Sequence, residues 1–594
     1  MGKNRCPLSD LGSPTTINDL YWQDTTGGVQ PTFYLDDIAL VNSGLSTPTP
    51  APPGSGPALS VVASAEVHSI NPNIYGMNFA DQNLAIELRL PVSRWGGNGT
   101  TRYNWRQDAS NHASDWYFEN LPNDNPHPEL LPDGSASDLF VEQNRRTHTQ
   151  TLLTVPLIGW TPKSRQVACG FSVSKYGAQQ STDPWQSDCG NGVNSNGTPL
   201  TGKDPHDTSL AIDPGFVQDW MRHLISKYGS ATGGGVRFYN LDNEPMLWNS
   251  THRDVHPQAT SYDEINSRTQ AYAAAIKAVD NHAETLGPVL WGWTAYFYSA
   301  ADFANGGSNW TGTRPDRKAH GDTPFVAWYL QQMQAYQQSH GVRILDFLDL
   351  HYYPQALGVA LSSAGNAATQ ALRLRSTRSL WDPNYVDESW INGTEGGPAV
   401  RLIPRMQGWV AANYPGTKLA ITEYNWGAWD HINGPLAQAD VLGIFGREGL
   451  DLATLWAPPN PDQPAAFAFR IFRKYDGVGG TFGNSSVHAA SANQDQLSIY
   501  AARRTADGAL TLIVINKTSG ALTSSISLSD FDSSANAQVY RYSAANLSAI
   551  QHSPDQPIGS SGFSATFPSN SITLFVIPPS EPASNFIRLP LICR

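Results

Sequence analysis

Residues 213–241, DPGFVQDWMRHLISKYGSATGGGVRFYNL, read as one helix followed by one strand. Asp213 and Pro214 match a helix N-cap and first turn, and Gly229 matches a stop. The apolar side chains that recur at the spacing of one helix face are Phe216, Val217, Trp220, Leu224 and Tyr228. Residues 236–241 then form a short run typical of a buried strand. The stretch predicts one helix–strand unit of an α/β protein.

The same alternation extends over residues 70–475, where Ser261 and Glu264 form a second capping pattern before a helix. The eight predicted strands are residues 74–79, 91–95, 151–158, 236–241, 289–294, 347–353, 419–423 and 453–456. Eight repeats favour a (β/α)8 TIM barrel. A doubly wound open sheet is the alternative, but no glycine-rich dinucleotide loop follows any predicted strand.

The flanks divide the chain further. Residues 1–43 resemble the last strands of a carbohydrate-binding β-sandwich, and residues 44–57 form a Pro/Thr/Gly linker. We expect residues 58–70 to supply a strand to a C-terminal antiparallel β-sandwich, residues 486–580, whose strands are separated by Ser/Asn/Gly/Asp turns. The barrel then occupies residues 71–485, and residues 581–594 form a tail.

The composition limits the classes of molecule that the protein is expected to bind. The net charge is −13, from 38 Lys+Arg against 51 Asp+Glu, and there is no basic run, so nucleic acid is not an expected partner. No apolar run approaches the roughly 18 residues of a membrane span. The 18 Trp and 23 Tyr favour carbohydrate binding, since aromatic rings stack on sugar faces, although a large barrel core also uses them.

The cysteines and the first residues indicate in which cellular compartment the protein is expected. Cys169 and Cys189 flank a Gly/Ser/Asp-rich loop and could close it as a disulfide, which fits an exported protein. Cys6 and Cys593 cannot be paired from the sequence. The opening residues MGKNRC contain no apolar signal region, and we expect the chain to begin within a domain, with a leader removed together with upstream sequence. We expect a secreted monomer.

The motif YNLDNEP, residues 239–245, lies at the carboxyl end of the fourth predicted strand, where barrel active sites form. Pro245 ends strand pairing, so Glu244 is expected at the barrel rim. Asn243 is placed to hydrogen-bond a sugar hydroxyl. The alternative is a surface turn with an ordinary acidic residue.

Glu423 ends the seventh predicted strand, in LAITEYN, residues 419–425. A carboxylate after buried strand residues needs partners or a polar cavity. A structural ion pair with Arg94 is the alternative. Together, Glu244 and Glu423 lie on strands four and seven of one barrel mouth. Glycosidic cleavage uses two such carboxylates, one as acid and one at the anomeric carbon.

Three linked motifs resemble glycoside hydrolase family 44, a family of retaining endo-β-1,4-glucanases and xyloglucanases. They are RWGGN at 94–98 with TRYNW at 101–105, DNEP at 242–245 with Leu247 and Trp248, and ITEYNWG at 421–427. The resemblance covers residues 58–580 and implies that Glu244 is the acid/base and Glu423 the nucleophile. Met246 departs from the family pattern, in which an acidic residue is usual.

Other residues support this pair. Arg94 is expected to hydrogen-bond the Glu423 carboxylate, and Tyr353 to orient it. His351 and Tyr353 should share one face of strand six, with Tyr352 on the other. The remaining substrate-binding candidates are tryptophans at strand ends: Trp456 as a floor beneath the sugar, and Trp95, Trp248 and Trp426 as stacking platforms for further glucose units.

The proposed chemistry requires no metal or cofactor. The loops at residues 123–126 and 181–188 offer oxygen ligands, but at irregular spacing, so no metal ligand can be assigned. The resemblance implies that a structural Ca²⁺ can occur.

The sequence thus predicts a retaining endo-glycosidase acting on β-1,4-glucans, such as xyloglucan, carboxymethyl-cellulose-type substrates and mixed-linkage glucan. The alternatives are an exo-acting arabinofuranosidase or xylosidase with the same fold, and a carbohydrate-binding protein without turnover. The presence of both Glu244 and Glu423 argues against the last.

Overall fold

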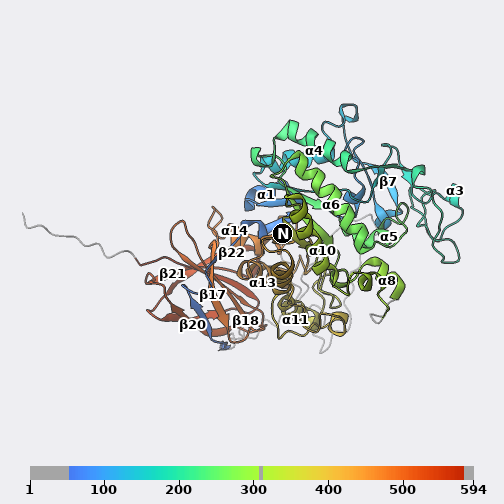
Figure 1. Cartoon of the computed structure of the whole chain (residues 1–594). Coiled ribbons are helices and arrows are strands. Elements are labelled where there is room, and N and C mark those ends of the chain that lie inside the picture. The colour runs from blue at the N-terminus through green and yellow to red at the C-terminus, as the bar shows by residue number, and fades with distance from the viewer. Residues whose placement is uncertain (1–52, 307–311, 581–594) are drawn as a thin grey trace, which may run out of the picture. The chain divides into compact units, whose positions relative to one another are not determined.

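The computed structural model describes residues 53–306 and 312–580 (Figure 1). The predicted β-sandwich fragment at 1–43, most of the linker, Cys6, Cys593 and the tail at 581–594 lie outside these ranges. Within them, no helix is long and apolar enough to cross a membrane.

Eight parallel strands close into a barrel, which confirms the predicted fold class. In chain order the strands are β4 (Gly76–Asn78), β5 (Val92–Trp95), β8 (Gln150–Val155), β12 (Phe238–Leu241), β13 (Glu284–Leu290), β14 (Phe347–Leu350), β15 (Lys418–Ile421) and β16 (Leu452–Leu455). Each strand pairs with its neighbours in chain order, and β16 closes the ring on β4.

The fifth strand was misplaced by the sequence analysis. It runs over Glu284–Leu290 instead of residues 289–294, and Trp293 already belongs to helix α7 (Trp293–Phe297). Gly287 and Pro288 lie inside the strand, and both residue types normally mark turns. The register shifts between Pro288 and Leu290, where an irregularity accommodates them.

Helices that follow the barrel strands cover the outside of the barrel. These helices are α1 (Gln82–Leu88), α2 (Ala136–Arg146), α4 (Pro214–Tyr228), α6 (Tyr262–Val279), α10 (Phe325–His340), α12 (Leu402–Asn413), α13 (Asn433–Arg447) and α14 (Ala466–Arg473). The predicted caps are confirmed: Asp213 caps α4 through the Phe216 amide, and Ser261 caps α6 through the Glu264 amide. Gly229 ends α4 with φ 89°.

The barrel interior is built in layers, because side chains two apart on a strand point the same way. Toward the amino ends of the strands lies a closed apolar layer, formed by Val92, Leu152, Phe238, Leu286, Phe347, Ala420 and Leu452. Two residues further along, the inward positions turn polar: Arg94, Thr154, Asn240, Asp349, Thr422 and Thr454, all fully buried. The apolar layer therefore lies beneath the polar layer, and the polar layer lies beneath the barrel mouth.

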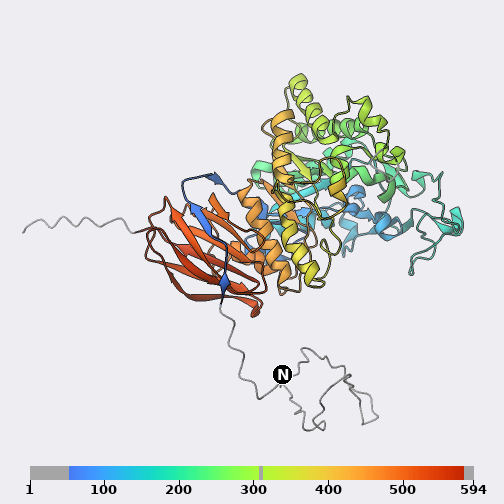
Figure 2. The ribbon, with the colours of Figure 1, turned by 90° about the horizontal axis from the view of Figure 1, so that it is seen from below.

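The C-terminal part forms an antiparallel β-sheet domain around its own core. Its strands are β17 (Ser485–Ser491), β18 (Leu497–Arg503), β19 (Leu510–Asn516), β20 (Leu522–Ser529), β21 (Asn536–Ser543), β22 (Asn546–Pro557), β23 (Gly562–Phe567) and β24 (Ser571–Ile577). Strand β2 (Leu59–Val62) lies between β17 and β20, and appears as a blue strand among the orange ones in Figure 2. Residues from both ends of the described chain thus build one sheet.

This sheet domain packs on the barrel through α13. Gly443 of α13 allows the close approach, since a Cβ there would meet the Tyr500 ring at 2.3 Å. Beside it, the buried Asp440 carboxylate pairs with Lys517 at 2.7 Å and accepts hydrogen bonds from the hydroxyls of Tyr500 and Thr377. The two domains share a sealed polar contact within an apolar interface.

Long loops follow β5 and β8 at the carboxyl ends of the strands. They carry a small sheet of β6 (Ala109–Asn111), β7 (Glu119–Pro122) and β10 (Ala168–Cys169) and a two-stranded pair of β9 (Trp160–Pro162) and β11 (Ser209–Ala211). A disulfide joins Cys169 and Cys189, as the sequence indicated, and closes the loop that contains α3 (Val173–Tyr176).

Candidate active site

Glu244 lies just beyond β12, where the chain turns into the short helix η8 (Pro245–Leu247). Its backbone adopts φ 49°, and Asp242 two residues earlier adopts φ 73°. Left-handed backbone is unfavourable for such residues and persists only when the surroundings hold it. Here the Glu244 amide donates to the Val289 carbonyl at 3.0 Å, and the Asp242 carboxylate accepts from the Leu157 amide at 2.6 Å. The strained turn aims the Glu244 side chain into the barrel mouth.

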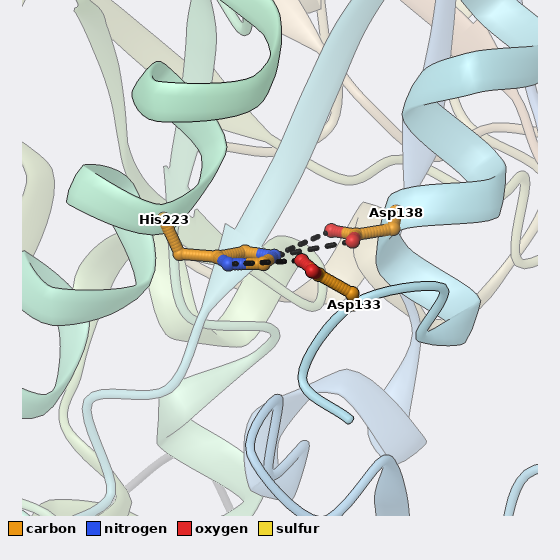
Figure 3. A group of neighbouring side chains, drawn as sticks. All are labelled: Asp133, Asp138 and His223. Carbon is orange, nitrogen blue, oxygen red and sulfur yellow. Dashed lines mark hydrogen bonds and ion pairs between the residues drawn. The ribbon is translucent and has the colours of Figure 1, made fainter. Parts of the chain in front are cut away.

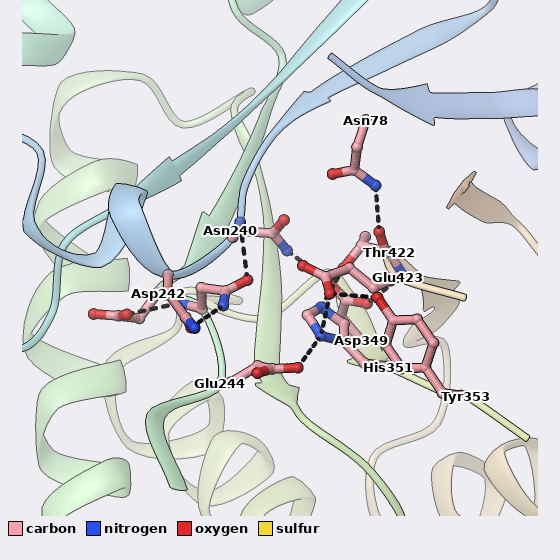
Figure 4. A network of polar contacts seen from close by, with 12 residues as sticks. Asn78, Asn240, Asp242, Glu244, Asp349, His351, Tyr353, Thr422 and Glu423 are labelled. Atoms are coloured by element: carbon pink, nitrogen blue, oxygen red, sulfur yellow. Dashed lines mark hydrogen bonds and ion pairs between the residues drawn. The ribbon is translucent and has the colours of Figure 1, made fainter. Parts of the chain in front are cut away.

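Glu423 follows β15 and faces Glu244 across the mouth (Figure 4). Its Oε1 accepts a hydrogen bond from Arg94 Nη1 at 2.8 Å, and its Oε2 accepts one from the Tyr353 hydroxyl at 2.8 Å. The structure therefore places Arg94 and Tyr353 on the carboxylate that the sequence analysis paired with them. The two hydrogen bonds fix the orientation of this carboxylate.

His351, which follows β14, lies between the two glutamates. Its Nδ1 is 2.8 Å from Glu244 Oε1 and 3.4 Å from Glu423 Oε2. One carboxylate oxygen of each glutamate and this nitrogen all lie within 4.8 Å of one another. His351 and Tyr353 share the inward face, while Tyr352 packs outward against Trp426, as the alternation predicted.

The environment separates the proton affinities of these groups. Burial raises the pKa of Glu244 to about 7, Asp115 adds to the rise, and Arg94 opposes it. Burial lowers the pKa of His351 to about 4, although the Glu423 carboxylate opposes that shift. Near pH 6 the site therefore holds a protonated Glu244 beside a neutral imidazole, an arrangement suited to donating a proton.

Arg94 organises the floor of the site. Its guanidinium also donates to Asn240 Oδ1 at 2.7 Å, Asn78 Oδ1 at 3.1 Å and Asn243 Oδ1 at 2.8 Å. The Asn243 oxygen accepts from the Gly97 amide as well, at 3.2 Å, and its Nδ2 donates to Asn98. The amide predicted to bind a sugar hydroxyl is thus largely used in holding Arg94 in place.

Sequence reasoning missed four buried polar residues of this network: Asn78, Asn240, Asp349 and Thr422. A signal for one of them was present, because Asp349 precedes His351 by two residues. Residues at even spacing on a strand share its inward face.

Of the four predicted tryptophan platforms, Trp456 keeps a place at the mouth. It follows β16, is partly exposed, and its ring lies against Gly97, where a Cβ would come within 2.5 Å of it. Gly97 has φ 84°, so glycine meets both the steric and the backbone requirement there.

The expectation for the other three was wrong. Trp248 and Trp426 are fully buried; Trp248 packs on His256, and the Trp426 indole donates to Ser376 Oγ at 3.0 Å. Trp95 points away from the mouth, because Arg94 takes the inward position, and packs against Phe140 of α2. Each follows a motif that reaches the rim, but none offers a face to a sugar. Met246, the departure from the family pattern, is also buried.

A second group of titratable side chains, Asp133, Asp138 and His223, lies outside the mouth (Figure 3). His223 Nε2 contacts Asp138 Oδ1 at 2.9 Å. The ammonium of Lys227 already lies 2.7 Å from Asp138 and 3.2 Å from Asp133. Lys227 supplies the positive charge of this group, which is therefore an ion-pair network that joins α2 and α4.

The two loops considered for a metal differ in their fit to Ca²⁺. In residues 123–126, the side-chain amides of Asn123 and Asn125 donate to the Asp108 carboxylate, which also accepts from the Ala136 amide, so this carboxylate is already satisfied by hydrogen bonds. In the other loop, the buried Asp183 faces buried Glu119, whose Oε1 has no hydrogen-bond partner among the described residues. Burial and the nearby Asp183 raise the pKa of Glu119 to about 8. Two buried carboxylates with an unpartnered oxygen fit a hard cation.

Comparisons with known proteins agree with this geometry. The sequence model of glycoside hydrolase family 44 matches residues 109–356. Endoglucanase A of Paenibacillus lautus is 32% identical over 499 residues, which cover 82% of this chain and 67% of that protein. Among solved structures, CelM2, a bifunctional glucanase-xylanase from a metagenome library, is 44% identical with a TM-score of 0.84, covering 89% of this chain and all of that one.

A xyloglucanase of Paenibacillus polymyxa from the same family, solved with xyloglucan, is 29% identical with a TM-score of 0.73, covering 88% of this chain and 99% of that one. The match extends over both the barrel and the β-sheet domain. The chain belongs to glycoside hydrolase family 44.

Proposed function

We propose that this glycoside hydrolase cleaves internal β-1,4-glucosidic bonds by double displacement, with Glu244 as acid/base and Glu423 as nucleophile. The observation that carries the proposal is the facing pair of carboxylates, with oxygens within 4.8 Å of each other across the barrel mouth. Retaining glycosidases hold their carboxyl groups about 5 Å apart, whereas inverting enzymes need a wider gap for a water molecule.

In the first step Glu423 Oε attacks the anomeric carbon, and Glu244 gives its proton to the departing glycosidic oxygen. The C–O bond to the leaving chain breaks as the glycosyl ester forms. Arg94 and Tyr353 orient the nucleophile through one hydrogen bond to each of its oxygens. Because burial keeps Glu244 protonated up to about pH 7, the acid is available at neutral pH.

In the second step the Glu244 carboxylate takes a proton from water, whose oxygen attacks the same anomeric carbon. The ester bond breaks, Glu423 is released, and the configuration is retained. Trp456, partly exposed beside Gly97, supplies an apolar face for the sugar next to the cleaved bond.

The relatives support a β-1,4-glucan as substrate. The names of the similar proteins include an endoglucanase, a glucanase-xylanase and a xyloglucanase. Since the 44% identical relative is described as bifunctional, β-1,4-xylan is a second candidate substrate. A xylan backbone differs from glucan by the missing hydroxymethyl group and presents the same ring faces.

We also propose that Glu119 and Asp183 hold a structural Ca²⁺, which would neutralise their mutual repulsion and fix the loop that ends at the disulfide. The Cys169–Cys189 bridge supports an extracellular location, because such bonds persist in oxidising compartments.

The central experiment replaces Glu244 and Glu423 separately by Gln and measures reducing sugar released from xyloglucan, carboxymethyl cellulose and xylan. Each change should lower kcat by at least about 10³-fold. Azide should rescue Glu423→Gly with an inverted glycosyl azide. Substantial activity in either Gln variant would remove that residue from its role, and release of monosaccharide alone would favour an exo-acting enzyme.

A further inference from the structure

Four buried residues of the barrel form a hydrogen-bonded chain that ends at Glu244: Asn240, Asp349, Thr422 and His351. Each has no solvent exposure. Of these, only His351 touches a glutamate of the proposed pair, and the mechanism above uses none of the other three. Arg94, at the start of this chain, fixes the direction of each hydrogen bond in it.

The hydrogen bond between Asn240 and Asp349 can run in one direction only. A guanidinium only donates, so the atom of Asn240 that faces Arg94 Nε at 2.7 Å is the amide oxygen. The amide nitrogen of Asn240 then points to Asp349 Oδ2 at 2.5 Å and donates to it. The first link therefore presents Asp349 with a donor.

Thr422 supplies Asp349 with two further donors. Its backbone amide donates to Asp349 Oδ1 at 3.1 Å, and its hydroxyl donates to Oδ2 at 2.7 Å. Because that hydroxyl proton is committed to Asp349, the oxygen offers a lone pair to His351 Nε2, 3.2 Å away. His351 Nε2 must then carry the ring proton.

A neutral imidazole has one N–H, so Nδ1 of His351 is left with a lone pair. Glu244 Oε1 lies 2.8 Å from this nitrogen, and a hydrogen bond of that length needs a proton on one of the two atoms. We propose that Asn240, Asp349 and Thr422 are positioning residues that fix the tautomer of His351, so that Glu244 rests in its protonated form. This inference rests on the acid/base role proposed for Glu244.

The charged and titratable groups around the chain are compatible with this direction. Those that face it are Arg94 of β5, Glu423 and Tyr353 at the mouth, Asp115 beyond Glu244, and Tyr296 of α7, whose hydroxyl donates to the His351 carbonyl. The lowered pKa of His351 keeps the ring neutral. Burial raises the pKa of Asp349, while His351, Arg94 and the hydrogen bonds from Thr422 and Asn240 oppose that rise.

The hydrogen-bonded chain also fits the second step of the reaction. Once Glu244 has given up its proton, its carboxylate faces a nitrogen lone pair and gains no hydrogen bond from it. That unfavourable contact strengthens Glu244 as the base that takes a proton from water. A tautomer with the proton on Nδ1 would instead stabilise the carboxylate and weaken both roles.

Three variants test the direction of the chain. Asp349→Leu removes the acceptor of the Thr422 hydroxyl, which frees that hydroxyl to donate to His351 Nε2 and drives the proton to Nδ1. Thr422→Val removes the link, and Thr422→Ser keeps it. Thr154→Val is the matched control, because Thr154 lies in the same buried layer and its hydroxyl has no partner among the described residues.

The first measurement is the pH dependence of kcat/KM with aryl cellobiosides. In Asp349→Leu the basic limb should move down by about one pH unit or more, a tenfold loss of proton affinity at Glu244. The loss should be large for phenyl leaving groups and less than about twofold for 2,4-dinitrophenyl, which departs without an acid. Thr422→Ser and Thr154→Val should match the parent, and Thr422→Val should fall between.

The second measurement reads the tautomer directly by ¹⁵N NMR of histidine-labelled protein, with His351→Gln to assign the signal among the 15 histidines. The proton should be on Nε2 in the parent and on Nδ1 in Asp349→Leu. A parent signal with the proton on Nδ1, or an unchanged basic limb in a folded Asp349→Leu, would overturn the inference. If Glu244→Gln stays active, the proposed function fails first, which separates the two results.

Discussion

Replacing Lys517 by Met probes the sealed contact between the barrel and the β-sheet domain. Lys517 and Asp440 are only 2% and 1% exposed and lie 2.7 Å apart. Removing one partner of such a pair leaves a buried charge without compensation, which costs about 3–5 kcal/mol. A folded unit of about 520 residues unfolds with an entropy of roughly 1.1 kcal/mol per kelvin. The expected fall in Tm at pH 7 is therefore about 3–5 °C.

The loss of stability in Lys517→Met depends on pH. Burial raises the pKa of Asp440, but the attraction of Lys517 and the hydrogen bonds outweigh it, so the pKa is lowered overall. A carboxyl with a lowered pKa stabilises the fold above its unfolded pKa, and that stabilisation is lost as the pH falls through its folded pKa. Without Lys517, protonation of the Asp440 carboxyl at low pH costs little free energy and removes the buried charge. The difference in Tm between variant and parent should thus shrink from pH 7 to pH 4.

Differential scanning calorimetry at both pH values measures these shifts. Lys418→Met is the matched control, because Lys418 pairs with Glu284 at 2.6 Å but is 45% exposed, and its loss should cost less than about 1 kcal/mol. Lys517→Met with Asp440→Asn should recover part of the loss. An unchanged Tm in Lys517→Met, or a double variant less stable than the single one, would refute the reasoning.

The remaining predictions concern the site and its loops. kcat/KM should fall about tenfold per pH unit above about pH 7 as Glu244 ionises, and a flat profile to pH 9 would contradict its burial. Trp456→Ala should lower kcat/KM on cello-oligosaccharides by about 10- to 100-fold, from roughly 1.5–3 kcal/mol of lost apolar contact; an unchanged value would place the sugar elsewhere. The pKa of Glu119 is raised to about 8, so the free energy of unfolding should decline as the pH rises from 5 to 8. Ca²⁺ should abolish the corresponding fall in Tm. An equal fall in Tm with Ca²⁺ and with EGTA would argue against the metal site. Cys169→Ser should cost about 3 kcal/mol, read as a lower denaturant midpoint, because the bridged residues are 20 apart; dithiothreitol should have no further effect on the variant.

Local patterns were enough to predict the barrel. The cap at Asp213 and the stop at Gly229 follow from backbone chemistry that tertiary packing does not override. The fifth strand could not be placed, because Gly287 and Pro288 have the chemistry of a turn and are tolerated only by an irregular register with β14.

The site was predicted where function depends on position along a strand and missed where it depends on burial. Glu244 and Glu423 lie at strand ends, so counting strands brought them together. Trp248 and Trp426 also follow strand ends, yet both rings turn into the core, and no local pattern distinguishes a buried indole from an exposed one. Asp349 lies within an apolar strand and Thr422 directly follows another, and their hydrogen bonds depend on strands far away in sequence.

Strand β2 precedes the whole barrel in the chain, yet it is hydrogen-bonded on both edges by strands that follow the barrel. During synthesis it must wait, unpaired, until more than 400 further residues have left the ribosome. A protein fragment that begins after the barrel would present two open sheet edges and invite aggregation. Linking Leu59–Val62 directly to such a fragment should restore its solubility, which makes this strand a practical guide for dissecting the enzyme.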